Sequence, residues 1–303
     1  MPFLAILAVA VVALAAGREE NSLRVPVWAP AGVELTGEQL HVKVDGKKTK
    51  ILGVRGPEAG LMLLVILDVA GDLSLVEPAR QALTAGMDKA PENVYAGLLR
   101  AQDGLQVVLD PTAAREDFRA AVDAQAVGGR AGLLNTVDTV TRLADAIAGK
   151  ADVRLAALYI SDSNIHNYRE DYTNPVVNSS DSRDLSRRFP EGLVKEKIAR
   201  LLASVAARQT PLFIVHLDYR SDRLNEAYQT GLLELATATG GTAEFCRSVG
   251  EIPAAVSKTL EAILTHWSVE VELPEKAAKQ ATVAVEAQET SLRYRSRFLL
   301  QDK

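Results

Sequence analysis

Cysteine is almost absent from this chain of 303 residues, in which Cys246 is the only one. A single cysteine excludes an internal disulfide and a cysteine-rich zinc site. Since free cysteine is usually buried, we expect Cys246 to fill core space at the end of a strand. Aromatic residues are also scarce, at 5% of the chain, so no stacking platform for sugars or bases stands out.

Enzyme signatures are missing as well. The chain has no Gly-x-Ser-x-Gly elbow after a strand, no Gly-x-Gly-x-x-Gly run and no Walker phosphate loop. An aspartate-nucleophile phosphatase needs a second aspartate two positions after the first, but Asp68 is followed there by Ala70. These absences predict a protein that is not an enzyme and that uses no small-molecule cofactor. The net charge of -5, with both signs mixed along the chain, argues against a nucleic-acid partner.

The N-terminus has the pattern of an export signal. Residues 4–16 are apolar and rich in alanine, and Ala13-Leu14-Ala15 provides a small-x-small cleavage site before Gly17. The run is shorter than the roughly 20 residues of a membrane-spanning helix, and no lysine or arginine precedes it. We predict a signal peptide over residues 1–17 and a periplasmic or secreted protein, which touches a membrane only through this segment if it stays uncleaved.

An unbroken apolar run from Leu61 to Leu67 ends abruptly at Asp68. Such a short run is typical of a strand buried on both faces, as at the centre of a parallel sheet. Strand and helix patterns then alternate along residues 58–265, which predicts an α/β domain with a doubly wound, mostly parallel sheet flanked by helices. We expect strands at residues 61–67, 94–100, 106–109, 153–160, 211–217 and 242–246, and helices at 77–89, from 110 onward, 133–147, 191–208, 224–238 and 252–265.

Both ends of the chain, residues 22–53 and 266–300, are rich in strand patterns. The Asp45-Gly46 pair is a strong hairpin signal in the first of them. In the last strand pattern, Arg295 and the arginines two positions to either side form one basic face. We predict that the two ends pair into a single small β-rich module beside the α/β domain. The strand patterns lie at residues 22–28, 40–44, 47–52, 267–273, 282–287 and 292–299.

Two strands of the predicted sheet end in aspartate, at Asp68 and Asp162, and Asp72 lies one loop beyond the first. Ligands of open α/β sheets bind beyond the carboxyl ends of the strands, where these carboxylates would share one crevice. Paired carboxylates with hydroxyls nearby form the oxygen-ligand set that Mg²⁺ prefers. The alternative is that Asp68 caps the next helix or accepts hydrogen bonds from loop amides.

These residues resemble the metal ion-dependent adhesion site of the von Willebrand factor type A (VWA) domain family. That site has an Asp-x-Ser-x-Ser motif after the first strand, a threonine on a later loop and an aspartate after the fourth strand. Asp68 and Asp162 match its aspartates, but Ala70 and Asp72 stand where the serines would be. Arg130, in a Gly-Gly-Arg-Ala run, replaces the threonine. The resemblance implies a degenerate site with Asp68, Asp72 and Asp162 as metal ligands.

The resemblance runs from Val25 to Leu300 and is closest to exported bacterial VWFA-related proteins. It leaves two states of the site open. In the state that the residues favour, the Arg130 guanidinium pairs with Asp68 or Asp162 and takes the place of the metal. In the other state, Asp72 supplies the missing ligand for Mg²⁺ or Ca²⁺.

A long polar stretch, residues 163–190, follows the second aspartate. Its Asn164, His166, Tyr168 and Tyr172 form a polar and aromatic set of the kind used for recognition. We therefore expect an exported, non-enzymatic adhesion module that binds a protein partner at the carboxyl end of the sheet. A structural assembly module with a silent site and a metal-dependent hydrolase remain as alternatives.

Overall fold

The computed structural model describes residues 21–170, 172, 190–274, 279–288 and 290–300. The predicted signal peptide and most of the polar stretch after residue 170 lie outside these ranges. Within them, no helix combines the length and the apolar character needed to cross a membrane.

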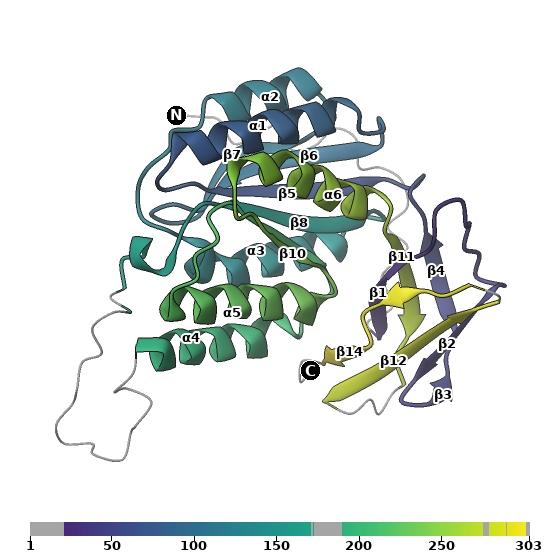
Figure 1. Cartoon of the computed structure of the whole chain (residues 1–303). Coiled ribbons are helices and arrows are strands. Elements are labelled where there is room, and N and C mark those ends of the chain that lie inside the picture. The colour runs from purple at the N-terminus through teal and green to yellow at the C-terminus, as the bar shows by residue number, and fades with distance from the viewer. Residues whose placement is uncertain (1–20, 171, 173–189, 275–278, 289, 301–303) are drawn as a thin grey trace, which may run out of the picture.

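A six-stranded sheet forms the centre of the molecule (Figure 1). Its order is β10-β9-β8-β5-β6-β7, and all neighbours are parallel except β6 and β7. The apolar run at residues 61–67 lies in β5, one of the two central strands. The predicted α/β class with a mostly parallel sheet is confirmed. The strands are β5 (Leu61–Asp68), β6 (Val94–Arg100), β7 (Gln106–Thr112), β8 (Arg154–Ser161), β9 (Leu212–His216) and β10 (Ala243–Phe245).

Helices cover both faces of this sheet (Figure 1). Leu63 and Val65 of β5 pack in the cluster that contains α1, α2 and α6, whereas Leu64 and Ile66 pack with α3, α4 and α5. Because side chains alternate across a strand, burial of both faces requires the continuous apolar run that the sequence shows. The helices are α1 (Leu73–Asp88), α2 (Arg115–Asp123), α3 (Leu133–Ala148), α4 (Pro190–Val205), α5 (Arg223–Thr239) and α6 (Ile252–Leu264).

The two ends of the chain form the predicted β-rich module, which has two antiparallel sheets (Figure 1). One has the order β13-β1-β11-β4 and the other β14-β12-β2-β3. Valines from both ends of the chain meet in its core, because Val25 pairs with Val269 and Val42 with Val285. The strands are β1 (Ser22–Trp28), β2 (Leu40–Val44), β3 (Lys47–Lys48), β4 (Ile51–Arg55), β11 (Trp267–Glu272), β12 (Gln280–Ala287), β13 (Arg293–Tyr294) and β14 (Arg297–Leu299).

The helix predicted from Asp110 onward is wrong at its start. Residues 110–112 are the end of β7, and α2 begins only at Arg115. The prediction took Pro111 for a proline that opens a helix. β7 is the edge strand of the sheet, where a residue without a backbone N–H is tolerated.

The predicted basic face of the last strand pattern keeps Arg293 and Arg297, which are exposed, but is wrong for Arg295. Arg295 is only 4% exposed, and its guanidinium donates to the backbone carbonyls of Ala206, Arg208 and Arg297. Because the first two carbonyls lie just after α4, this arginine ties the module to the α/β domain. Burial lowers the pKa of Arg295 to about 9.

A second buried arginine joins the two parts at the amino end of the sheet. Arg154 begins β8 and is 1% exposed. Its guanidinium donates to four backbone carbonyls where the chain enters and leaves the module, and two of them, Pro57 and Ala59, also accept from Asn93 Nδ2. These acceptors are the carbonyls of Pro57, Ala59, Leu264 and His266, at 2.8–3.1 Å.

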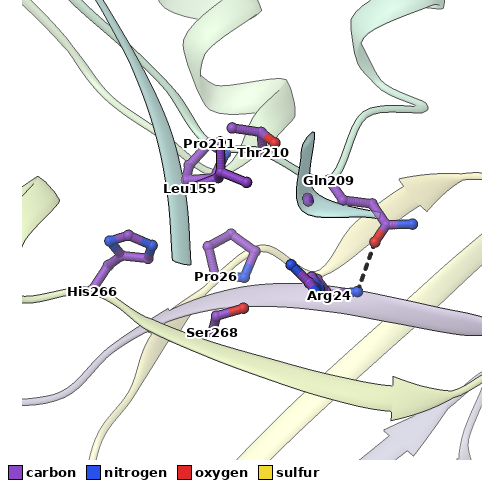
Figure 2. A pocket seen from close by; sticks show the side chains of 9 residues that line it. Arg24, Pro26, Leu155, Gln209, Thr210, Pro211, His266 and Ser268 are labelled. Atoms are coloured by element: carbon purple, nitrogen blue, oxygen red, sulfur yellow. Dashed lines mark hydrogen bonds between the residues drawn. The ribbon is translucent and has the colours of Figure 1, made fainter. Parts of the chain in front are cut away.

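A small pocket lies at the same junction (Figure 2). Its volume is about 20 Å³, enough for little more than one water molecule. The backbone amide of Arg24 in β1 donates to Gln209 Oε1 across its rim at 3.0 Å (Figure 2). This pocket is therefore part of the packing between the module and the α/β domain, and is too small for an organic ligand.

Candidate functional site

Asp68 ends β5 and is completely buried. Its Oδ1 accepts a hydrogen bond from the amide of Gly132 at 2.8 Å, and its Oδ2 accepts one from Leu133 at 3.2 Å. Gly132 precedes α3 and has no capping side chain of its own, so Asp68 caps that helix from a neighbouring strand. Burial raises the pKa of the Asp68 carboxyl to about 6, although both amide hydrogen bonds oppose this effect.

Asp162 follows β8 and binds the loop after β5. Its Oδ1 accepts from the amide of Ala70 at 2.6 Å, and its Oδ2 accepts from the amides of Gly71 and Asp72, each at 2.9 Å. Three successive amides that point at one carboxylate form a concave anion-binding turn. The two aspartates thus lie at the same end of the sheet, as predicted, and each is held by backbone donors of a different loop.

Asp72 and Arg130 do not join them. Asp72 is exposed and accepts a hydrogen bond from the amide of Ser74, so it is the N-cap of α1. Hydrogen bonding from the Ser74 side chain, and then from its amide, holds the pKa of the Asp72 carboxyl below the usual range. The Arg130 side chain is exposed, and no ion pair between it and Asp68 or Asp162 occurs in the described residues. Arg130 therefore does not take the place of a metal ion between the carboxylates.

The donor set does not fit a divalent cation. Both oxygens of Asp68 and of Asp162 already accept amide hydrogen bonds. Positions 70 and 130 carry no side-chain oxygen. In the part of the chain that the structure describes, no group of three or more His, Cys, Asp or Glu side chains is arranged to hold a metal ion. We derive no role for a metal here.

His216 and Ser163 lie near the aspartates without forming a nucleophile and base. His216 Nε2 is 3.0 Å from the backbone carbonyl of Ser163, and the Ser163 hydroxyl donates to the backbone carbonyl of Asp68 at 3.2 Å. Burial lowers the pKa of His216. Because the imidazole contacts the serine carbonyl and not its hydroxyl, this pair has no geometry for acyl transfer.

Three of the four predicted recognition residues are buried. Asn164 caps the short 3-10 helix η1 (Ile165–Asn167), accepting from the amide of His166 at 2.9 Å. Tyr168 is 3% exposed, and its hydroxyl lies 2.9 Å from that of Tyr228 and accepts from the amide of Leu134. Tyr172 is 4% exposed, and only His166 is exposed. The set anchors its loop instead of presenting four side chains to solvent.

An open hollow of about 730 Å³ lies beside these residues. One wall is the segment after Gly128 and the other is the segment after Asn164. Sequence reasoning missed Arg169, which is exposed at this hollow and directly follows a residue that was singled out. The lining residues are Asp103, Gly129, Arg130, Ile165, His166, Tyr168, Arg169, Glu170 and Tyr172.

No protein-family model and no curated protein matches the chain. Among solved structures, it is similar to a mutant of the PilB minor pilin from Streptococcus sanguinis, at 10% identity and a TM-score of 0.48, over 68% of this chain and 62% of that chain. It is also similar to a von Willebrand factor type A protein from Catenulispora acidiphila, at 9% identity and a TM-score of 0.46, over 93% and 74%. Proximal thread matrix protein 1 of the mussel byssus gives 10% identity and a TM-score of 0.45, and 70% of this chain spans half the length of that protein.

Proposed function

We propose that this chain is a non-enzymatic protein-binding module that uses the carboxyl end of its central sheet and needs no metal ion. The observation that carries the proposal is the hollow of about 730 Å³ at that end. A concave site of this size with charged, polar and aromatic lining fits side chains of a protein partner. The apolar segment at residues 4–16 supports an exported setting for this binding.

The chemistry around the hollow favours binding over catalysis. Asp68 and Asp162 are occupied by amides, and His216 faces a carbonyl. The acidic groups that a hydrolase would use are thus committed to holding the loops in place. A preorganised surface of this kind lowers the cost of binding a partner, because little has to be ordered on association.

Site-specific photo-cross-linking tests where a partner binds. A photoreactive residue replaces Leu73, which is 62% exposed at the start of α1, or His166 at the hollow. Matched replacements at Leu233 on α5 and Leu299 in the β-rich module serve as controls. Irradiation of the protein in cells of its source should give the same adduct from both sites at the carboxyl end and from neither control.

Two outcomes contradict the proposal. If adducts form only from Leu299, the β-rich module is the assembly surface and the carboxyl end of the sheet is silent. If neither Leu73 nor His166 gives an adduct, the carboxyl end does not bind a protein.

Metal independence has its own test. The melting temperature of the wild type should stay within about 1 °C in EDTA, Mg²⁺ or Ca²⁺, since a ligand that binds only the folded state raises it by mass action. Arg130→Thr should behave in the same way, because the aspartates keep their amide partners. A metal-dependent rise in the wild type contradicts a metal-free site, and a rise only in the variant shows that Arg130 blocks one.

A further inference from the structure

Two acidic residues and two arginines line the hollow, and they differ in their partners. Its two acidic residues have partners within the protein: Asp103 Oδ1 accepts from the Arg130 amide at 3.2 Å, and Glu170 accepts from Lys197 Nζ at 3.2 Å and from the Tyr172 hydroxyl. The guanidiniums of Arg130 and Arg169 are both exposed, and neither makes an ion pair or side-chain hydrogen bond within the described ranges. Two permanent cations therefore face the hollow with open donors.

The walls that carry these arginines are fixed. On one side, the amide of Gly128 donates to the carbonyl of Val69 at 3.1 Å. Between the walls, the amide of Ala131 donates to the carbonyl of Asn167 at 3.0 Å. On the other side, the amide of Ile165 donates to Asn225 Oδ1 at 3.0 Å. Since the backbones that bear both guanidiniums are held together, binding an anion has to order only the two arginine side chains.

The overall charge of the protein does not attract an anionic ligand to these arginines. The chain carries a net charge of -5, so its long-range field does not attract anions. An anionic ligand thus has to gain its affinity from the hollow itself. Guanidinium groups offer planar, paired donors that match a carboxylate.

We propose that the hollow binds carboxylates of an acidic segment on the protein partner, with Arg130 and Arg169 as the receiving groups. This inference rests on the proposed function and names the chemistry of the partner. It assigns no role to Asp68, Asp72 or Asp162 in contacting the ligand. The contact is a direct ion pair between the protein and the partner.

The test measures anisotropy of a dye-labelled poly-glutamate peptide titrated with the full chain, beside a poly-glutamine peptide of equal length. Poly-glutamate should bind and poly-glutamine should not. Arg130→Ala and Arg169→Ala should each weaken binding about 5- to 10-fold, as expected for loss of one charge-assisted pair. Arg297→Ala is the matched control: it removes an exposed arginine of the β-rich module and should change affinity less than about twofold.

Two results overturn the inference: no binding of poly-glutamate, or an equal loss of affinity in the Arg297→Ala control. The cross-linking adduct separates this failure from failure of the proposed function. If the adduct from His166 persists in Arg130→Ala/Arg169→Ala, the protein still binds its partner there and only the acidic chemistry is wrong.

Discussion

Buried charge has opposite signs at the two ends of the central sheet. At the carboxyl end, Asp68 and Asp162 accept hydrogen bonds from backbone amides. At the amino end and the module junction, Arg154 and Arg295 donate to backbone carbonyls. In both places backbone dipoles solvate a buried ionic group that has itself lost contact with water.

The comparison separates structural charge from charge that is open to a ligand. Arg154 and Arg130 are the same residue type, but the first is 1% exposed with its carbonyl partners and the second is exposed without an ion pair in the described residues. The acids also differ in exposure, because Asp162 is buried and holds a loop, whereas Asp72 is exposed and caps a helix. The exposed arginines at the hollow, and not the buried aspartates, therefore define the binding chemistry that we propose.

The largest expected effect comes from removing the charge at the amino end. Arg154→Met keeps much of the side-chain volume but leaves the carbonyls of Leu264 and His266 without this donor, while Asn93 Nδ2 still donates to those of Pro57 and Ala59. The free energy of unfolding should fall by about 3–5 kcal/mol, since each buried polar group without a partner costs about 1–3 kcal/mol and some relaxation follows. Urea denaturation of the full chain measures this difference.

Arg142→Met is the matched control. Arg142 lies on the exposed side of α3 and pairs with Asp138 one turn away, so its loss should cost less than about 0.5 kcal/mol. Equal losses in the two variants would show that the carbonyls near Arg154 find other donors.

The fold could be predicted because its signals are local. The run from Leu61 to Leu67 has no polar break, which is required of a strand buried on both faces. The start of α2 was mispredicted because Pro111 is equally compatible with the first turn of a helix and with an edge strand, and only the position of β7 in the sheet decides between them. Arg295 was grouped with Arg293 and Arg297 on one basic face because alternation along a strand cannot reveal that α4 ends beside it.

The site was predictable only in part. The positions of Asp68 and Asp162 followed from the ends of two parallel strands. Their partners are backbone amides, which every sequence supplies, so no residue type marks them in advance. One signal was available: a Cβ at Gly132 would lie 1.8 Å from the carbonyl oxygen of Ala101, so this glycine marks a close backbone approach beside Asp68.

A smaller effect is expected from the carboxylate that holds the loop after β5. Asp162→Ala leaves the amides of Ala70, Gly71 and Asp72 without their acceptor. The free energy of unfolding should fall by about 2–3 kcal/mol, less than for Arg154, because this loop is partly exposed and water can replace the carboxylate. Hydrogen exchange at residues 70–72 should accelerate in this variant.

Asp162→Asn tests whether the acceptor oxygen or the charge matters. The amide side chain keeps one oxygen for these donors, so about half of the loss should remain. If Asp162→Asn and Asp162→Ala are equally destabilised, the charge of the carboxylate dominates. If neither loses stability, the comparison between the two ends of the sheet fails at its carboxyl end.

The last expected effect is the pH dependence that Asp68 gives to stability. Burial raises the pKa of its carboxyl from the ordinary value of 3.8 to about 6, so the folded state binds the proton more tightly. Stability contributed by this group is therefore present below about pH 4 and is lost as the pH rises toward 6, with a slope of at most about 1.4 kcal/mol per pH unit. Asp222 and Glu270 have lowered pKa values and act in the opposite direction.

The free energy of unfolding of the wild type and of Asp68→Asn, measured across this pH range, isolates the contribution of Asp68. If the two curves of free energy against pH are parallel, the Asp68 carboxylate is not desolvated by burial. The same outcome would remove the contrast with Arg154, because the carboxylate at the carboxyl end of the sheet would then be as well solvated in the folded protein as in water.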